Sequence, residues 1–210
     1  MSAAPPGSDP AAAALIGALA ACRLCAADFA RSASRHQPRP VVWFSPGARV
    51  LIAGQAPGVR VHASGRPFTD PSGDRLRDWL GLEPAAFYDR ARIAIVPMAF
   101  CFPGDDGKGG DLPPPRRCAE HWRAPVMATL PAVRLTFLVG AHAQRWHLGV
   151  AATTGGVTAT VARWRDHAPR IFVLPHPSWR NSGWLKRNPW FADDLLPAAR
   201  AALDEVMADG

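Results

Sequence analysis

The four cysteines of this chain are the residues whose types and spacing point most directly to chemistry. Cys22 and Cys25 form a Cys-x-x-Cys pair, and Cys101 and Cys118 follow much later in the sequence. Four thiolates can hold a tetrahedral zinc ion or a [4Fe–4S] cluster, and the spacing does not decide between the two. Two other interpretations stay open, because a lone Cys-x-x-Cys pair can be redox-active or incidental and Cys101 could simply pack in the core.

A second group of reactive side chains lies in the segment 174–190, LPHPSWRNSGWLKRNPW. It combines His176 and several tryptophans with the cations Arg180, Lys186 and Arg187, and it contains no acidic residue. An imidazole can donate or accept a proton near neutral pH, cations attract phosphates, and aromatic faces stack on bases. The segment therefore has the composition of a nucleic-acid contact that also carries a catalytic candidate.

The elements that must position these residues follow from the hydrophobic pattern. Short apolar runs without alternation are typical of strands buried on both faces, and they span 48–54, 92–98, 133–140 and 170–176. Helical patterns span 11–34 with an interruption at 22–25, a stretch after the expected N-cap Ser72, 119–130, 141–149 and 189–208. This alternation predicts one domain over residues 1–210, with a three-layer α/β/α fold around a central, mostly parallel four-stranded sheet.

The loops 55–71, 101–117 and 177–189 each follow the carboxyl end of an expected strand. Ligands of such sheets bind at that edge, so we expect the functional residues of the three loops to meet there. Residues 1–10 have the composition of a frayed terminus.

Composition limits the classes of protein that this chain can belong to. Its 24 Lys and Arg against 17 Asp and Glu give a net charge of +7, which suits a polyanionic partner, although a high-GC genome also enriches arginine. No apolar run approaches the roughly 20 residues that a membrane helix needs, and no basic residues precede the early apolar stretch as in a signal peptide. We expect a cytoplasmic monomer that does not bind membranes.

The segment 54–81, GQAPGVRVHASGRPFTDPSGDRLRDWLG, resembles the first motif of the uracil-DNA glycosylase superfamily, nearest its iron–sulfur-containing bacterial and archaeal branches. The family pattern Gly-x-Ala-Pro-Gly followed by Gly-Arg-x-Phe corresponds to 54–58 and 65–68, and the second motif, His-Pro, corresponds to 176–177. The resemblance runs from about residue 22 to about residue 200 and includes the four cysteines, which hold a [4Fe–4S] cluster in those branches. It therefore favours that cluster over zinc.

The resemblance implies hydrolysis of the N-glycosidic bond of deoxyuridine in DNA, which releases uracil and leaves an abasic site. Phe68 would stack on the extruded base in a uracil-binding pocket that includes Gly54 and Ala56. His176 would donate a hydrogen bond to uracil O2 as negative charge develops there. The remaining catalytic candidates are Gln55 and Asp70, which would position water or stabilise the cationic sugar.

The second-motif loop of the family enters the minor groove and fills the gap left by the extruded base. The implied DNA-binding residues here are Ser178, Arg180, Asn181, Trp184, Lys186 and Arg187, with Trp179 as an alternative wedge. The alternative is a purely structural role, in which Trp184, Trp190 and Phe191 only pack the final helix. For Trp190 we favour that interpretation.

Some residues depart from the family pattern, so this chain could form a separate branch. Gln55 stands where the Gly-x-Ala-Pro-Gly branch has Glu, and Pro97 stands where that branch has a uracil-reading Asn. Asp70 matches the water-activating Asp of a related branch only if a gap of one residue is allowed. Two functions other than hydrolysis are therefore weighed as well, namely a non-catalytic uracil- or damage-binding module and an iron–sulfur electron carrier.

Overall fold

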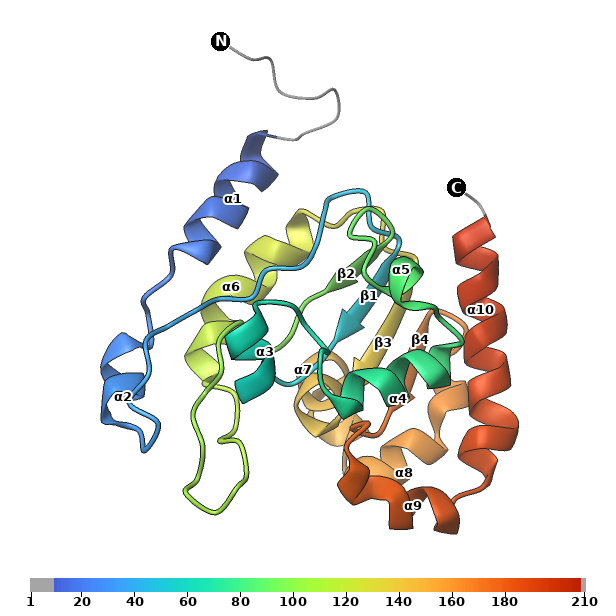
Figure 1. Ribbon diagram of the computed structural model, residues 1–210. Helices are drawn as coiled ribbons and strands as arrows, with labels where there is room; N and C mark the ends of the chain where they lie inside the picture. The colour runs from blue at the N-terminus through green and yellow to red at the C-terminus, as the bar shows by residue number, and fades with distance from the viewer. Residues whose placement is uncertain (1–9, 209–210) are drawn as a thin grey trace.

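The computed structural model of the protein describes residues 10–208, so residues 1–9 of the expected frayed terminus lie outside the described part of the chain. One sheet forms the centre of the fold (Figure 1), with the order β2-β1-β3-β4 and parallel pairing throughout. Its strands are β1 (Val50–Ala53), β2 (Ile93–Ile95), β3 (Leu135–Val139) and β4 (Ile171–Leu174). All four lie within the predicted apolar runs, which confirms the predicted α/β/α fold and its sheet.

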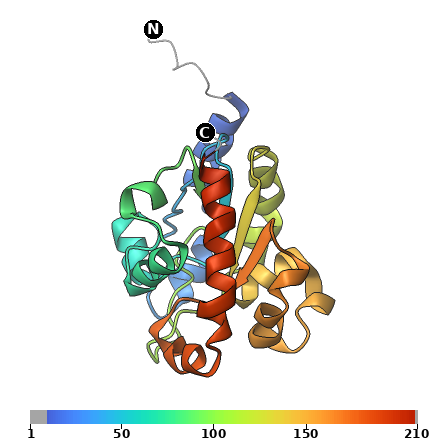
Figure 2. The same cartoon turned by 90° about the vertical axis from the view of Figure 1, so that its right-hand side faces the viewer.

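Helices cover both faces of this sheet. The α-helices are α1 (Pro10–Ala20), α2 (Ala26–Arg31), α3 (Val59–Ser64), α4 (Pro71–Leu80), α5 (Pro84–Phe87), α6 (Arg116–Ala128), α7 (Ala141–Ala152), α8 (Gly156–Ala162), α9 (Ser182–Arg187) and α10 (Leu196–Ala208). Short 3₁₀ turns, η1 (Trp164–Asp166) and η2 (Trp179–Asn181), and a π-helical turn, η3 (Phe191–Leu195), complete the described elements. Figure 2 shows α3 to α5 on one side of the sheet and α6 to α8 on the other.

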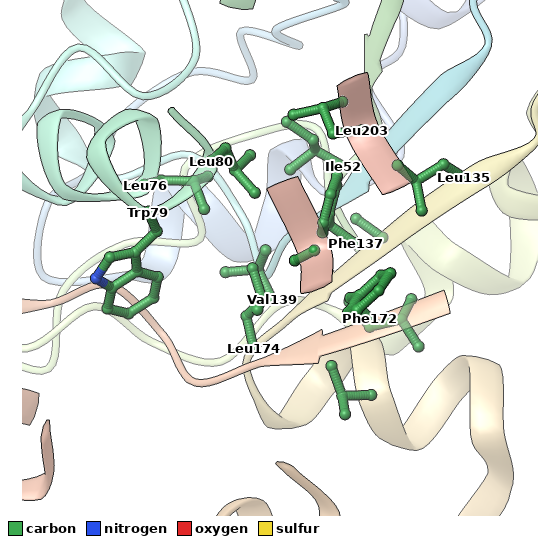
Figure 3. Packing of buried hydrophobic residues seen from close by; sticks show 14 of the residues in the cluster. Ile52, Leu76, Trp79, Leu80, Leu135, Phe137, Val139, Phe172, Leu174 and Leu203 are labelled. Atoms are coloured by element: carbon green, nitrogen blue, oxygen red, sulfur yellow. The ribbon is translucent and has the colours of Figure 1, made fainter. Parts of the chain in front are cut away.

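The strands are apolar on both faces because each face meets a helical layer. Figure 3 shows Ile52 and Phe137 packed toward the α4 side chains Leu76 and Leu80 and toward Leu203 of α10, and all five residues are nearly inaccessible to solvent. A second cluster lies on the opposite face, where Leu51 and Ala94 of the sheet meet α1 and α6. Burial on both sides fixes the strands, so the loops at their carboxyl ends start from rigid positions.

Several helix boundaries differ from the prediction by a few residues, and two of them have a clear cause at a proline. The N-cap of α4 is Asp70 rather than Ser72, because Pro71 suits the first helical position and the Asp70 side chain accepts a hydrogen bond from the Gly73 amide. The last helix begins with the π-helical turn and becomes regular only at Leu196. Pro197 follows at once, and it lacks the N–H that a regular turn would need there.

The loops after the strands contain more structure than predicted. The segment 55–71 holds α3, which ends at Gly65 in the left-handed conformation, and 177–189 holds η2 and α9. The segment 101–117 stays irregular before α6, apart from a bridge between Asp105 and Asp111. No helix within residues 10–208 is long and apolar enough to cross a membrane.

Candidate active site

A cavity opens at the carboxyl edge of the sheet, where the strand arrowheads of Figure 1 lead into the loops. All six residues assigned from the sequence to catalysis or to the base pocket line it, namely Gly54, Gln55, Ala56, Phe68, Asp70 and His176. Ten further residues complete the lining, namely Val41, Pro57, Gly58, Val61, Pro67, Ser72, Ile95, Pro97, Asp111 and Val139. The cavity thus has mainly apolar walls with a few polar groups, as small-molecule sites usually do.

Phe68 is held in an unusual backbone conformation. Its φ is +54°, a left-handed value that costs a non-glycine residue about 1–3 kcal/mol. The Phe68 carbonyl accepts hydrogen bonds from the Tyr88 hydroxyl at 2.8 Å and from Arg77 at 3.2 Å, and these offset the strain. Gly73 permits this conformation, because a Cβ there would lie 1.9 Å from the Phe68 oxygen.

The ring of Phe68 forms one wall of the cavity. Its Cζ would lie 3.6 Å from a Cβ added to Gly54, and the ring packs edge-on against buried Phe87 at a centroid distance of 5.9 Å. The contact with Phe87 on α5 and the close approach to Gly54 after β1 place this ring at the carboxyl edge of the sheet.

His176 presents a defined nitrogen to the cavity. The Ser178 backbone N–H donates to Nδ1 at 3.2 Å, so in the neutral ring the proton sits on Nε2. Burial lowers the pKa of His176, and the carboxylate of Asp70 raises it by a smaller amount. The site accordingly contains a neutral imidazole at physiological pH, and this imidazole can donate a hydrogen bond.

Asp70 has two roles in the structure. Its Oδ1 accepts from the Ser72 hydroxyl at 2.7 Å and from the Gly73 amide at 3.2 Å, which caps α4. Its electrostatic effect on His176 shows that the two side chains share the cavity. Capping fixes the carboxylate, so it is a fixed negative charge beside the imidazole.

Asp111 is a cavity residue that sequence reasoning missed. It comes from the irregular 101–117 segment, and its Oδ2 would lie 3.2 Å from a Cβ on Gly58, a tight approach that glycine avoids. Burial raises the pKa of Asp111, and Asp70 raises it further. No pattern in the sequence separated Asp111 from Asp105 and Asp106, its neighbours in the same polar loop.

The second-motif loop lies beside the cavity. Trp179 is 70% exposed, whereas Trp184 packs edge-on against Trp190 and Phe191 and donates to the Thr158 hydroxyl at 2.7 Å. Trp184 is half-buried and its ring supports the start of the last helix, and its expected contact with DNA stays a prediction. Packing of Trp190 against the core confirms the interpretation favoured for it.

The other expected DNA-contact residues of this loop divide into two groups. Arg180, Lys186 and Arg187 are exposed cations. Ser178 and Asn181 instead build the loop, since the Ser178 hydroxyl accepts from the Arg180 amide and Asn181 donates to the His176 carbonyl at 2.7 Å. The loop thus offers charge to solvent and uses its uncharged polar groups to hold His176.

The family model of the uracil DNA glycosylase superfamily matches residues 41–200, most of the chain. The chain belongs to this superfamily. Membership agrees with the resemblance of the two motifs and indicates DNA glycosylase chemistry, and the superfamily match includes every residue that lines the cavity.

The superfamily match includes Cys101 and Cys118 but not Cys22 and Cys25. All four cysteines nevertheless line one small second cavity, together with apolar side chains such as Phe29. Burial raises the pKa of Cys101 to about 12 and that of Cys118 to about 11.

The four cysteines that line this second cavity are free thiols in the structure. Within residues 10–208, no three His, Cys, Asp or Glu side chains converge as they would around one metal ion. The Trp122 indole donates to the Cys22 sulfur at 3.3 Å, which orients that thiol. Four sulfur donors in an apolar cavity are a ligand set that an iron–sulfur cluster could use.

Proposed function

We propose that this protein is a monofunctional uracil-DNA glycosylase, which hydrolyses the N-glycosidic bond of deoxyuridine in DNA and leaves an abasic site. One observation carries this proposal, namely that His176 lines the same cavity as Gln55, Phe68 and Asp70 although it lies about 100 residues later in the chain. Each supplies a group that the reaction needs. Superfamily membership supports the same class of chemistry.

In the proposed reaction the bond between the sugar C1′ and uracil N1 breaks, and its electron pair leaves with the base. The Nε2–H of neutral His176 donates to uracil O2, where the negative charge accumulates, and one such donor typically contributes about 2.7–4 kcal/mol. The base is held on the face of Phe68, worth roughly 1–3 kcal/mol per stacked base. Water then adds to C1′ and loses its proton.

Two tasks are left for Asp70 and Gln55, namely to stabilise the sugar cation and to position the attacking water. An ionised carboxylate stabilises positive charge on the sugar and accepts a proton from water. The Gln55 side chain or backbone could orient that water. Among the residues that line the cavity there is no lysine, so the structure offers no amine there for a Schiff-base lyase step.

DNA would be bound by the second-motif loop. Arg180, Lys186 and Arg187 are exposed and suit phosphates, and the exposed ring of Trp179 suits the gap left by an extruded base. This assignment replaces Trp184 with Trp179 as the wedge. The loop also carries His176, so its docking on DNA and the placement of the imidazole would be linked.

We further propose that Cys22, Cys25, Cys101 and Cys118 hold a [4Fe–4S] cluster. All four thiols line the second cavity, so together they could serve as ligands of one group. Four thiolates suit either zinc or the cluster, and the motif resemblance favours the cluster. When bound, the cluster would cross-link the N-terminal segment to the 101–118 segment, and the glycosylase reaction needs no redox step from it.

Uracil release is tested with a labelled duplex that carries one U·G pair, followed by alkali to cleave abasic sites. We expect strand cleavage with the wild type and a loss of about 100-fold or more with His176→Ala. His167→Ala is the matched control, because His167 lies before the amino end of β4 and does not line the cavity. Uracil-specific binding without cleavage by the wild type would replace this proposal with the non-catalytic binding module.

A further inference from the structure

Helix α7 is interrupted at Gly149 by non-helical backbone, with φ at +84°, and an exposed apolar side chain lies on each side of this break. Trp146 before it is 40% exposed and Val150 after it is 62% exposed, and both line one groove. The inward face of α7 already packs against the protein interior. Buried Ala143 and Gln144 pack there, and the Gln144 amide donates to the Leu174 carbonyl at 2.8 Å, so Trp146 cannot turn inward without losing these contacts.

The exposed residues of α7 form one side of a groove, and the Pro-rich start of α6 forms the other. The lining consists of Met98, Pro114, Pro115, Arg116, Ala119, Ala141, His142, Arg145, Trp146 and Val150. It contains two arginines and a histidine and no acidic residue. Glu120, just outside the lining, pairs with Arg116 at 2.7 Å, but both side chains are largely exposed and such a pair is weak.

The groove adjoins the base cavity at two places. Met98 lines the groove while its neighbour Pro97 lines the cavity, and the Met98 amide donates to the Gly54 carbonyl at 2.9 Å. Gly140 precedes Ala141 of the groove, and a Cβ on Gly140 would lie 3.6 Å from Cβ of His176. The cavity and the groove therefore have neighbouring walls, formed by residues 97–98 and 140–141.

We propose that this groove binds the nucleotide next to the extruded one, with its base unpaired and stacked on Trp146 and its phosphate near Arg145. This inference rests on the proposed function, because the extruded base in the cavity sets the register. Positive charge without acidic residues suits a phosphate, and an aromatic face suits any base. A base can reach Trp146 only if it leaves its own stack, so the groove selects single-stranded uracil-containing DNA over the duplex.

The test measures binding rather than turnover. A fluorescent strand with one uracil nucleotide, whose 2′-fluorine blocks hydrolysis, is titrated with the protein by anisotropy, alone and annealed to its complement. We expect Trp146→Ala to weaken single-strand binding by about 5- to 150-fold and duplex binding much less. Trp146→Phe keeps an aromatic face and should retain most of the affinity. Arg145→Gln should reduce the salt dependence by about one phosphate contact.

Arg170→Gln is the matched control for charge, because Arg170 is exposed and directly precedes the amino end of β4. Equal affinity of Trp146→Ala and wild type for the single strand would overturn the inference, as would an equal loss on the duplex. Uracil release is assayed in parallel on ordinary substrate. Release without Trp146-dependent binding rejects the groove alone, whereas Trp146-dependent binding without release rejects the proposed hydrolysis and keeps the groove.

Discussion

The Ser178 backbone N–H donates to Nδ1 of His176 at 3.2 Å, and both residues lie on the loop after β4. This contact selects one tautomer of the neutral ring, because the nitrogen that accepts the hydrogen bond cannot carry the proton. Asn181 fixes the other side of His176 by donating to its carbonyl at 2.7 Å. The loop thus arranges the Nε2–H donor before any substrate binds, which is how preorganised sites stabilise developing charge.

Uracil release should stay active at pH values below the ordinary histidine pKa of about 6.5. Burial lowers the pKa of His176, so the neutral ring persists as the pH falls and is lost only at the lowered value. Because Asp70 opposes this shift, Asp70→Asn should move the pKa of His176 further down. The profile of kcat/KM against pH checks the first statement, and NMR titration of His176 checks the second. An upward shift in Asp70→Asn would contradict this account.

Gly73→Ala should destabilise the protein and impair catalysis together. Its Cβ would lie 1.9 Å from the Phe68 oxygen, so the backbone that holds the stacking ring must move. Overpacking of this kind costs about 1–3 kcal/mol, which corresponds to a fall in Tm of roughly 2–12 °C for a chain of this size. Gly17→Ala in α1 is the control, since nothing lies within 4 Å of its added Cβ. A Gly73→Ala protein with unchanged Tm and activity would show that Phe68 is not held as described.

Trp179→Ala and Trp184→Ala should have opposite effects, the first on activity and the second on stability. Trp179 is 70% exposed, so its removal should leave Tm nearly unchanged and reduce activity on duplex DNA. Trp184 is half-buried against Trp190 and Phe191, so its removal should lower the free energy of unfolding by less than the about 3–5 kcal/mol typical of a fully buried aromatic residue. Thermal unfolding and duplex cleavage, measured on both variants, separate the two roles. Loss of activity only in a fully stable Trp184→Ala protein would return the wedge to Trp184.

The cysteine cavity should contain iron and acid-labile sulfide in equal amounts after purification without oxygen. Cys101→Ser, which removes one of the four sulfur donors, should lose the visible absorbance of the cluster and lower Tm. Metal and sulfide analysis provides the measurement. A protein that binds one zinc ion and no sulfide would contradict the cluster, and it would require the four thiols to converge on binding.

The sheet could be predicted from the sequence because parallel strands with two covered faces must be apolar throughout. The motifs also predicted the cavity, since Gln55, Phe68 and His176 follow or lie near the carboxyl ends of strands that a parallel sheet brings together. The short helices α3 and α9 were missed because six residues are too few for a clear hydrophobic period.

Two features of the site depend on tertiary contacts that no local pattern reveals. Asp111 enters the cavity because its loop is fixed by the bridge to Asp105 and because Gly58, distant in sequence, leaves room. The choice between Trp179 and Trp184 rests on Thr158, which lies on α8 and gives the Trp184 indole a partner. Both tryptophans have similar neighbours in sequence, so their different exposure could only be seen in the folded chain.

Arg180 connects the two loops that border the cavity, because its guanidinium donates to the Gly109 carbonyl at 3.1 Å. The same side chain is the proposed phosphate ligand nearest to His176. If phosphate takes all of its donors, the Gly109 carbonyl loses this partner, and the segment that carries Asp111 keeps its internal bridge to Asp105 but loses this contact with the second-motif loop. The Gly109 carbonyl and a DNA phosphate would therefore compete for Arg180. Binding of the phosphate would weaken the contact between the second-motif loop and the 101–117 segment.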